Sequence, residues 1–132
     1  MTLEILLVDD DIVVQYLHKA VLSKCNFPEQ NFFSDGQLVL DYILKNRDEE
    51  ILFLIFLDIN MPVMNGWEFL DELKNNTIKP LLKVVIVTSS IDSSDKEKAE
   101  KYQEVFQFME KPLQQELVCN LKNDPDLAAY LN

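Results

Sequence analysis

Short runs of apolar residues alternate along the chain with longer segments in which apolar residues recur at helical spacing. The short runs are typical of buried strands, and the longer segments are typical of amphipathic helices that cover a sheet. Because the two kinds of segment alternate, the pattern favours βαβ units and a parallel sheet. The predicted strands are residues 5–8, 31–33, 52–57, 84–87 and 105–109.

The predicted first helix opens directly after Asp11. An aspartate in that position favours the N-cap role, because its carboxylate can accept hydrogen bonds from the first free backbone N–H groups. The single histidine, His18, is expected on the polar side of this helix and receives no functional role. The apolar residues at helical spacing are Ile12, Val13, Tyr16, Leu17, Ala20 and Val21.

Four further helices complete an alternating pattern of five strands and five helices. The dipeptide Asn65-Gly66 opens the third, and Trp67 is expected to anchor it in the core. The fourth is a highly charged segment at 92–103, with Ala99 and Tyr102 as its inward candidates. Apolar residues between 38 and 44 mark the second helix, and those between 113 and 121 mark the fifth. The predicted fold is one α/β domain of the (βα)5 type over residues 1–132, with a short apolar tail at about 124–132.

Composition narrows the classes of partner. The 132 residues include 23 Asp and Glu against 12 Lys and Arg, which gives a formal net charge of −11. Phosphate backbones are bound by clustered basic residues, so a nucleic-acid partner is not expected. The 48% of apolar residues excludes a disordered acidic tail. A protein or a cation fits this charge better.

The two cysteines, Cys25 and Cys119, lie far apart and lack the spacing of zinc ligands. We therefore expect neither a zinc site nor a disulfide, and interpret both as small packing residues in a reducing compartment. The first residues lack the basic start of a secretory signal, and the longest apolar run is too short to cross a bilayer. The sequence thus predicts a cytoplasmic protein without membrane contact.

Polar side chains follow four of the five predicted strands. Because the carboxyl ends of parallel strands meet at one edge of the sheet, these residues are expected to lie close together. They comprise acids, hydroxyls and one ammonium group. The segments are Asp9-Asp10-Asp11, Asp58-Ile59-Asn60, Thr88-Ser89-Ser90 and Glu110-Lys111-Pro112.

Several neighbouring carboxylates repel one another, and hard oxygen ligands suit Mg²⁺ or a similar cation. Such a cation, together with Lys111 and the hydroxyl of Thr88, would neutralise a transferring phosphoryl group. Asp58 ends the most apolar strand and is the natural nucleophile, because a carboxylate can accept a phosphoryl group as an acyl phosphate.

In this order, at strand ends, these motifs make the chain resemble the receiver domains of two-component response regulators, in particular the single-domain type related to chemotaxis regulators. The resemblance covers essentially the whole chain. It implies a doubly wound, flavodoxin-like sheet of order 2-1-3-4-5, no output domain, and a switch rather than a turnover enzyme. The segments that carry it are residues 5–10, 57–66, 87–89 and 110–113.

The resemblance also implies roles for individual residues. Asp58 would be phosphorylated by a histidine kinase or a histidine phosphotransfer protein. Mg²⁺ or Mn²⁺ would be held by Asp9, Asp10, Asp58 and the main-chain carbonyl of Asn60. Lys111 would pair with the phosphoryl oxygens, and the Lys111-Pro112 bond is expected to be cis.

The same resemblance implies that a two-state element, which includes Thr88 and Phe108, changes its conformation when Asp58 is phosphorylated. Thr88 would move to hydrogen-bond the phosphoryl group, and Phe108 would follow it inward. Phe108 lacks the phenol hydroxyl often found at this position, so only the packing of its ring can report the state. Ser89 stands where the family usually has Ala and is small enough to leave the site open, while Ser90 and Asn60 would tune the lifetime of the phosphoryl group.

Three other interpretations remain. The domain could be an intermediate carrier in a phosphorelay. Under each interpretation the downstream protein is not specified by the sequence, and the chain is expected to be a monomer or a weak dimer. It could be a haloacid-dehalogenase-like phosphatase with an Asp nucleophile, but that enzyme would need a second acid where this chain has Asn60. It could also be a degenerate, phosphorylation-independent scaffold, against which the complete set of acids, hydroxyl and lysine argues.

Overall fold

The computed structural model describes residues 1–89 and 92–131. Five strands form one parallel sheet of order β2-β1-β3-β4-β5, the order predicted above. The central strand β3 is buried along its whole length, as its unbroken apolar run predicts. The strands are β1 (Thr2–Val8), β2 (Gln30–Phe33), β3 (Ile51–Asp58), β4 (Leu81–Thr88) and β5 (Val105–Glu110).

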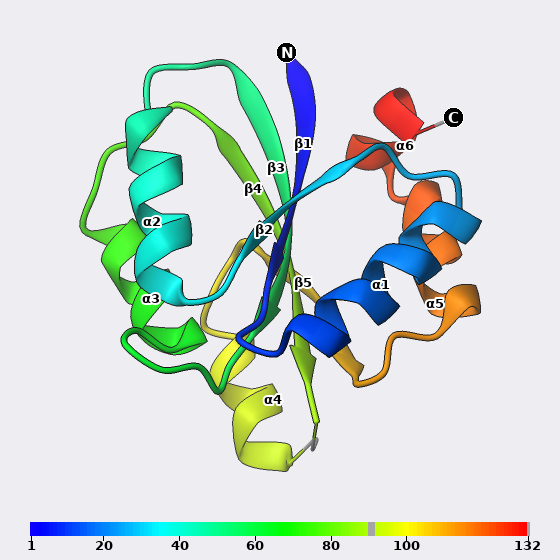
Figure 1. Cartoon of the computed structure of the whole chain (residues 1–132). Helices are drawn as coiled ribbons and strands as arrows, with labels where there is room; N and C mark the ends of the chain where they lie inside the picture. The colour runs from blue at the N-terminus through cyan, green and yellow to red at the C-terminus, as the bar shows by residue number, and fades with distance from the viewer. Residues whose placement is uncertain (90–91, 132) are drawn as a thin grey trace.

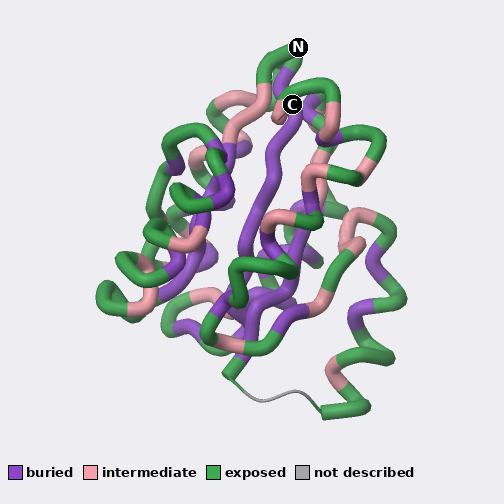
Figure 2. The backbone as a smooth tube through the Cα atoms, turned by 90° about the vertical axis from the view of Figure 1, so that its right-hand side faces the viewer, coloured by how far each residue is buried: buried purple, intermediate pink, exposed green. Residues whose placement is uncertain are grey.

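Helices cover both faces of the sheet (Figure 1). Figure 2 shows the strands largely buried at the centre and the outer turns of the helices exposed. One hydrophobic cluster lies between the sheet and α2, α3 and the end of α4, and a second lies between the sheet and α1, α5 and α6. The helices are α1 (Ile12–Lys24), α2 (Gly36–Lys45), α3 (Gly66–Lys74), α4 (Ser93–Ala99), α5 (Gln115–Asn120) and α6 (Pro125–Leu131), with a 3-10 turn η1 (Leu121–Asn123) before α6.

Helix α1 begins where predicted, because the carboxylate of Asp11 accepts hydrogen bonds from the backbone N–H groups of Val13 and Val14. Its buried face is not the predicted one. His18 and Leu22 are buried, whereas Ile12 and Tyr16 are more than 60% exposed. The prediction that His18 lies on a polar face was therefore wrong. Because His18 interrupts the apolar residues on the buried face of α1, the exposed face, which carries Ile12 and Tyr16, shows the more regular apolar spacing in the sequence.

The two cysteines form a disulfide, which corrects the expectation of two separate packing residues in a reducing compartment. Cys25 caps the C-terminal end of α1 and Cys119 lies in α5, with 5.1 Å between their Cα atoms. Both contribute to the cluster between the sheet and these helices. Their separation of 94 residues in sequence gave no spacing signal, because the contact depends on α1 and α5 packing side by side.

The apolar tail is the helix α6, and an ion-pair cluster holds its start against the sheet. Nζ of Lys83, on β4, lies 2.8 Å from Oδ2 of Asp124 and 2.9 Å from Oδ2 of Asp126. Leu127 is fully buried in the same region. The tail is thus a packed element of the domain.

Candidate functional site

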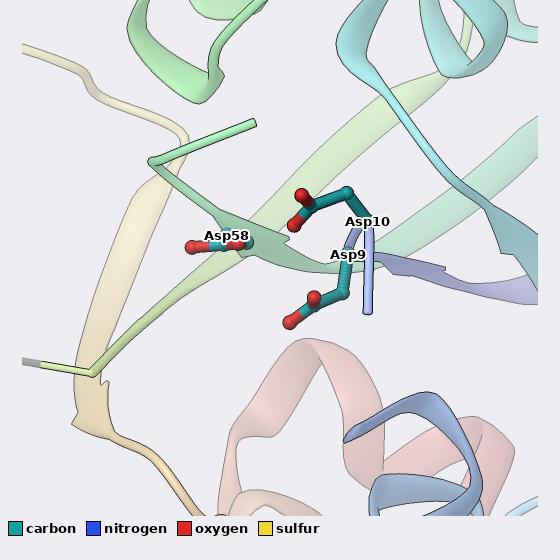
Figure 3. Close-up of side chains that lie close together, drawn as sticks. All are labelled: Asp9, Asp10 and Asp58. Carbon is teal, nitrogen blue, oxygen red and sulfur yellow. The ribbon is translucent and has the colours of Figure 1, made fainter. Parts of the chain in front are cut away.

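The carboxyl ends of β1, β3, β4 and β5 bring the predicted site residues to one edge of the sheet. Asp9 and Asp10 follow β1, Asp58 ends β3, and Figure 3 shows the three side chains close together. One carboxylate oxygen from each lies within 4.8 Å of the others. Asp9 and Asp58 are buried and Asp10 is exposed, so this acidic cluster opens to solvent on the side of Asp10.

Lys111 bridges the two buried carboxylates. Its Nζ lies 2.5 Å from Oδ2 of Asp9 and 3.2 Å from Oδ2 of Asp58. Burial lowers the pKa of Lys111, but the hydrogen bonds and charges of the two aspartates outweigh it and the net pKa is raised. The ammonium group is therefore held in its charged form beside both acids.

Asp58 has an environment that disfavours its charge. Burial raises the pKa of its carboxyl group, the charge of Lys111 lowers that pKa, and the charge of Asp9 raises it; the net pKa lies above the ordinary value of 3.8. The backbone N–H of Asn60 donates to Oδ1 at 3.2 Å. A cation at this edge would relieve the repulsion between the acids.

The backbone of β4 positions Lys111. The carbonyl of Thr88 accepts a hydrogen bond from the backbone N–H of Lys111 at 2.7 Å. Thr88 itself is 1% exposed and ends β4 beside Glu110 of β5. The Lys111-Pro112 peptide bond is cis, as predicted. Thr88 and Lys111 are thus placed at the same edge as Asp58.

Gly66 allows helix α3 to begin directly against Asp58. A Cβ atom at position 66 would lie 2.7 Å from the backbone oxygen of Asp58, so a larger residue would push the two segments apart. Helix α3 begins at Gly66, as the Asn65-Gly66 dipeptide predicted, and Asn65 caps it in a capping box with Glu68. The backbone of Asp58 is therefore fixed by α3 as well as by β3.

The acids present suit Mg²⁺ or Mn²⁺. Three carboxylates supply hard oxygen ligands, and the open side of the cluster leaves room for water ligands. Asn60 is exposed two residues after Asp58, and its main-chain carbonyl remains a proposed fourth ligand. Ser90 lies outside the described residues, and Ser89 is exposed at the end of β4.

Phe108 lies on β5 and is half-buried, packed against the cluster that includes α3 and the end of α4. It is paired in register with Ile86 of β4, two residues before Thr88. This location is compatible with ring packing as the reporter of a change at Thr88, which remains a proposal.

Sequence reasoning missed Gln15, whose amide contacts the backbone beside the acids. It lies on α1, away from the strand ends that were searched, and nothing in its local pattern separates it from a surface glutamine. Only the position of Asp11 as N-cap, four residues earlier, indicates that its side chain can reach the end of β1.

The fold and this edge define a flavodoxin-like α/β protein in which carboxylates, a buried threonine and a lysine lie together at the carboxyl ends of the strands. The sequence model of the response regulator receiver domain matches residues 5–122, and the chain belongs to this family. Receiver domains are the phosphorylation switches of two-component signalling. The family resemblance and the fold predicted from the sequence are both confirmed.

Solved structures agree with this assignment. A two-component response regulator from Cytophaga hutchinsonii is 29% identical with a TM-score of 0.77, covering 92% of this chain and 94% of that one. One from Legionella pneumophila is also 29% identical, with a TM-score of 0.75 and coverage of 96% and 98%. The receiver domain of a Pseudomonas aeruginosa sensor histidine kinase shares the fold at 23% identity, with a TM-score of 0.69 and coverage of 91% and 94%; that structure has a magnesium ion in its active-site cleft.

No curated protein sequence matches this chain. Among the described residues, none of the helices has the length and apolar character needed to cross a membrane.

Proposed function

We propose that this receiver domain accepts a phosphoryl group on Asp58 from the phosphohistidine of a histidine kinase or histidine phosphotransfer protein. The observation that carries the proposal is the buried Asp58 carboxylate, bridged to Asp9 by Lys111 at an open acidic edge. Family membership supports the same reaction. The domain acts as a switch rather than a turnover enzyme and signals through changed protein contacts.

In the proposed reaction, a carboxylate oxygen of Asp58 forms a bond to phosphorus while the phosphorus–nitrogen bond of phosphohistidine breaks. The electron pair of the broken bond stays on the imidazole, and the product is an acyl phosphate on Asp58. Lys111 already lies 3.2 Å from Asp58 and would pair with the phosphoryl oxygens. Thr88 would donate its hydroxyl hydrogen to one of them.

Asp9, Asp10, Asp58 and the carbonyl of Asn60 would hold Mg²⁺ or Mn²⁺. When bound, this cation offsets the negative charge of the carboxylates and of the transferring phosphoryl group. The site has a charge that such a cation would offset, because burial and the charge of Asp9 both disfavour the ionised form of Asp58 when no cation is present.

The exposed apolar face of α1 supports a protein donor. Ile12, Val13 and Tyr16 are each more than 60% exposed and follow directly on the acids. Ile12, Tyr16 and Phe32 also line a surface cavity of about 300 Å³. We propose that the donor covers this patch, because a partner seated there would bring its phosphohistidine to the edge that holds Asp58.

The first experiment uses acetyl phosphate and Mg²⁺, with intact-protein mass spectrometry as the measurement. We expect the wild type to gain the mass of one phosphoryl group, and Asp58→Asn to gain none. Asp48→Asn, a change of the same kind at an exposed loop acid, serves as the control and should behave as wild type. A wild type that stays unmodified would contradict the proposal and favour the scaffold interpretation. An Asp58→Asn variant that is modified equally would contradict the proposal by showing that another residue accepts the phosphoryl group.

The second experiment tests the donor surface. With a histidine kinase that phosphorylates the wild type, Tyr16→Ser is expected to slow transfer about tenfold, as loss of a central aromatic contact does in many interfaces. Its reaction with acetyl phosphate should not change. Leu81→Ser, which alters an exposed apolar residue at the opposite edge of the sheet, is the matched control. Equal loss with both donors would show that Tyr16 acts on the site itself.

A further inference from the structure

Gln15 joins the ends of two strands beside the acidic cluster. It lies in α1, half-buried, and its amide nitrogen Nε2 donates to the backbone oxygen of Asp9 at 2.6 Å. The same nitrogen donates to the backbone oxygen of Phe33 at 3.1 Å. A carboxamide nitrogen carries two hydrogens, so both donors of Gln15 are used on these two carbonyls.

These carbonyls stand where the sheet ends. The pairing of β1 with β2 runs to Val8 and Phe33, and the backbone N–H of Asp9 makes one more hydrogen bond to Phe33 at 3.0 Å. Beyond that point the chain after β1 turns into α1. At this point the Gln15 side chain donates the hydrogen bonds that a further strand would otherwise supply. The hydrogen-bonded region of the sheet therefore continues by one residue, to Asp9, in the segment that carries the acids.

The carbonyl of Asp9 belongs to the peptide unit that links Asp9 to Asp10. Because a peptide unit is planar, holding its oxygen fixes the directions in which the chain leaves on both sides. Asp9 is additionally fixed through its side chain, which accepts from the backbone N–H of Asp11 at 2.9 Å and contacts Lys111. Asp10 is exposed, so the orientation of its carboxylate depends strongly on this peptide unit.

We propose that Gln15 is a positioning residue of the cation site, which holds the Asp9–Asp10 peptide so that both carboxylates face Asp58. The inference rests on the proposed function, because it assigns Gln15 a task in the binding of Mg²⁺. Partners that orient metal ligands typically affect metal affinity by about 10- to 100-fold when they are changed. Gln15 acts through the backbone of its ligands, which places the expected effect near the lower end of that range.

The test measures Mg²⁺ affinity by titration calorimetry, far below the unfolding temperature, alongside thermal unfolding. Gln15→Met keeps the length of the side chain and removes both donors; we expect its dissociation constant for Mg²⁺ to rise about tenfold. Gln37→Met is the matched control, because Gln37 is also helical and donates through Nε2, to Asp41 at 2.8 Å, away from the site. A residue with a purely structural role would lower the unfolding temperature and leave the dissociation constant unchanged.

Gln15→Glu separates positioning from charge. The added carboxylate would strengthen Mg²⁺ binding if charge alone mattered, whereas its oxygens would repel the carbonyls of Asp9 and Phe33 if positioning matters. We expect weaker binding than in the wild type, despite the extra negative charge. Wild-type affinity in Gln15→Met, or a gain in Gln15→Glu, would overturn the inference.

The wild type distinguishes this inference from the function on which it rests. Measurable Mg²⁺ binding by the wild type, with no loss in Gln15→Met, overturns only the role of Gln15. A wild type that binds no Mg²⁺ contradicts the cation site itself, and the inference fails with it.

Discussion

At the scale of single residues, two buried titratable groups have pKa values shifted in opposite directions. The pKa of Asp58 is raised and that of His18 is lowered, and in both cases burial is the largest cause. Burial disfavours the charged form of each group, which is the anion for an acid and the cation for a histidine. The two residues should therefore give opposite dependences of stability on pH.

His18 should make the protein less stable in mild acid. Burial lowers its pKa from 6.5 to about 4, while the charge of Asp9 raises it and that of Lys111 lowers it. Between these values the unfolded chain binds the proton more tightly, so stability falls as pH falls through this window, by about 3 kcal/mol in total.

We expect His18→Leu to remove this part of the pH dependence. Urea unfolding of wild type and variant across the window from 6.5 down to about 4 provides the measurement. The unfolding free energy of the variant minus that of the wild type should increase as the solution becomes more acidic. A difference that stays constant would show that the imidazole titrates as in the unfolded chain.

Asp58 should cost stability once it is ionised. Its pKa in the folded protein lies above the ordinary value of 3.8, so the folded state binds this proton more tightly than the unfolded state does. The resulting stabilisation is present below pH 3.8 and is lost as pH rises through the folded-state pKa. Asp58→Asn removes the charge and should therefore raise the unfolding free energy of the domain at neutral pH.

Chemical denaturation without divalent cations measures this gain, and repeating it in acid supplies the internal control. The gain should shrink as pH falls through the raised folded-state pKa of Asp58 and should be absent below pH 3.8, because the wild-type carboxyl group is then neutral as well. A gain of the same size at every pH would point to packing rather than charge.

At the scale of elements, an aromatic pair joins the segment directly after α4 to α3. Helix α4 is short and charged, and Ala99 is its buried residue. Directly after it, the ring of Tyr102 stacks on that of Trp67, with centroids 5.5 Å apart, and its hydroxyl donates to Oδ1 of Asp71 at 2.7 Å. This pair, defined by Trp67 and Tyr102, connects the segment that leads into β5 with the helix that packs against Asp58.

Changes at Tyr102 should separate the hydrogen bond from the stacking. Tyr102→Phe keeps the ring and loses the bond to Asp71, at a cost of about 1 kcal/mol in unfolding free energy. Tyr102→Leu also loses the stacking and should cost about 2 kcal/mol or more. Trp67 is the only tryptophan, so its fluorescence reports the pair directly. Its emission should shift in Tyr102→Leu and change little in Tyr102→Phe, and equal spectra in all three proteins would contradict the stacked arrangement.

Local sequence signals predicted where the strands and helices lie better than they predicted which face of a helix is buried. The inner strands β1, β3 and β4 were predictable because their apolar runs suit buried parallel strands, whereas β2 is a short edge strand with exposed residues. The cap at Asp11 follows from side-chain chemistry within a few residues. The buried face of α1 was not predictable, since its inward side carries His18. The acidic cluster was predictable from strand ends alone, whereas the reach of Gln15 depends on how α1 is seated on the sheet.

At the scale of the whole molecule, the Cys25–Cys119 disulfide joins α1 to α5. It was not predictable because the two residues meet only after the sheet has formed and both helices have packed on it. A bond that closes a loop of this length restricts the unfolded chain, and the loop-closure entropy corresponds to about 4 to 5 kcal/mol of stability.

Reduction of this bond should lower the unfolding free energy by that order of magnitude. We expect a thiol reductant to lower the urea midpoint of the wild type. The double variant Cys25→Ser with Cys119→Ser should unfold at the same midpoint with and without reductant. An unchanged wild-type midpoint, with free thiols confirmed by alkylation and mass spectrometry, would show that helix packing alone supplies the stability.

The same bond also determines how the molecule would respond to mechanical force. If tension is applied at the two ends of the chain, it passes along residues 1–25, across the sulfur atoms, and along residues 119–132. Once β1 has separated from β2 and β3, the covalent loop between the cysteines, which contains Asp58, Thr88 and Lys111, bears none of that tension, whereas Asp9 and Asp10 lie on the loaded path. A pull on the oxidised protein would therefore separate Asp9 and Asp10, which follow β1, from the rest of the site, while the other site residues remain in an unextended loop.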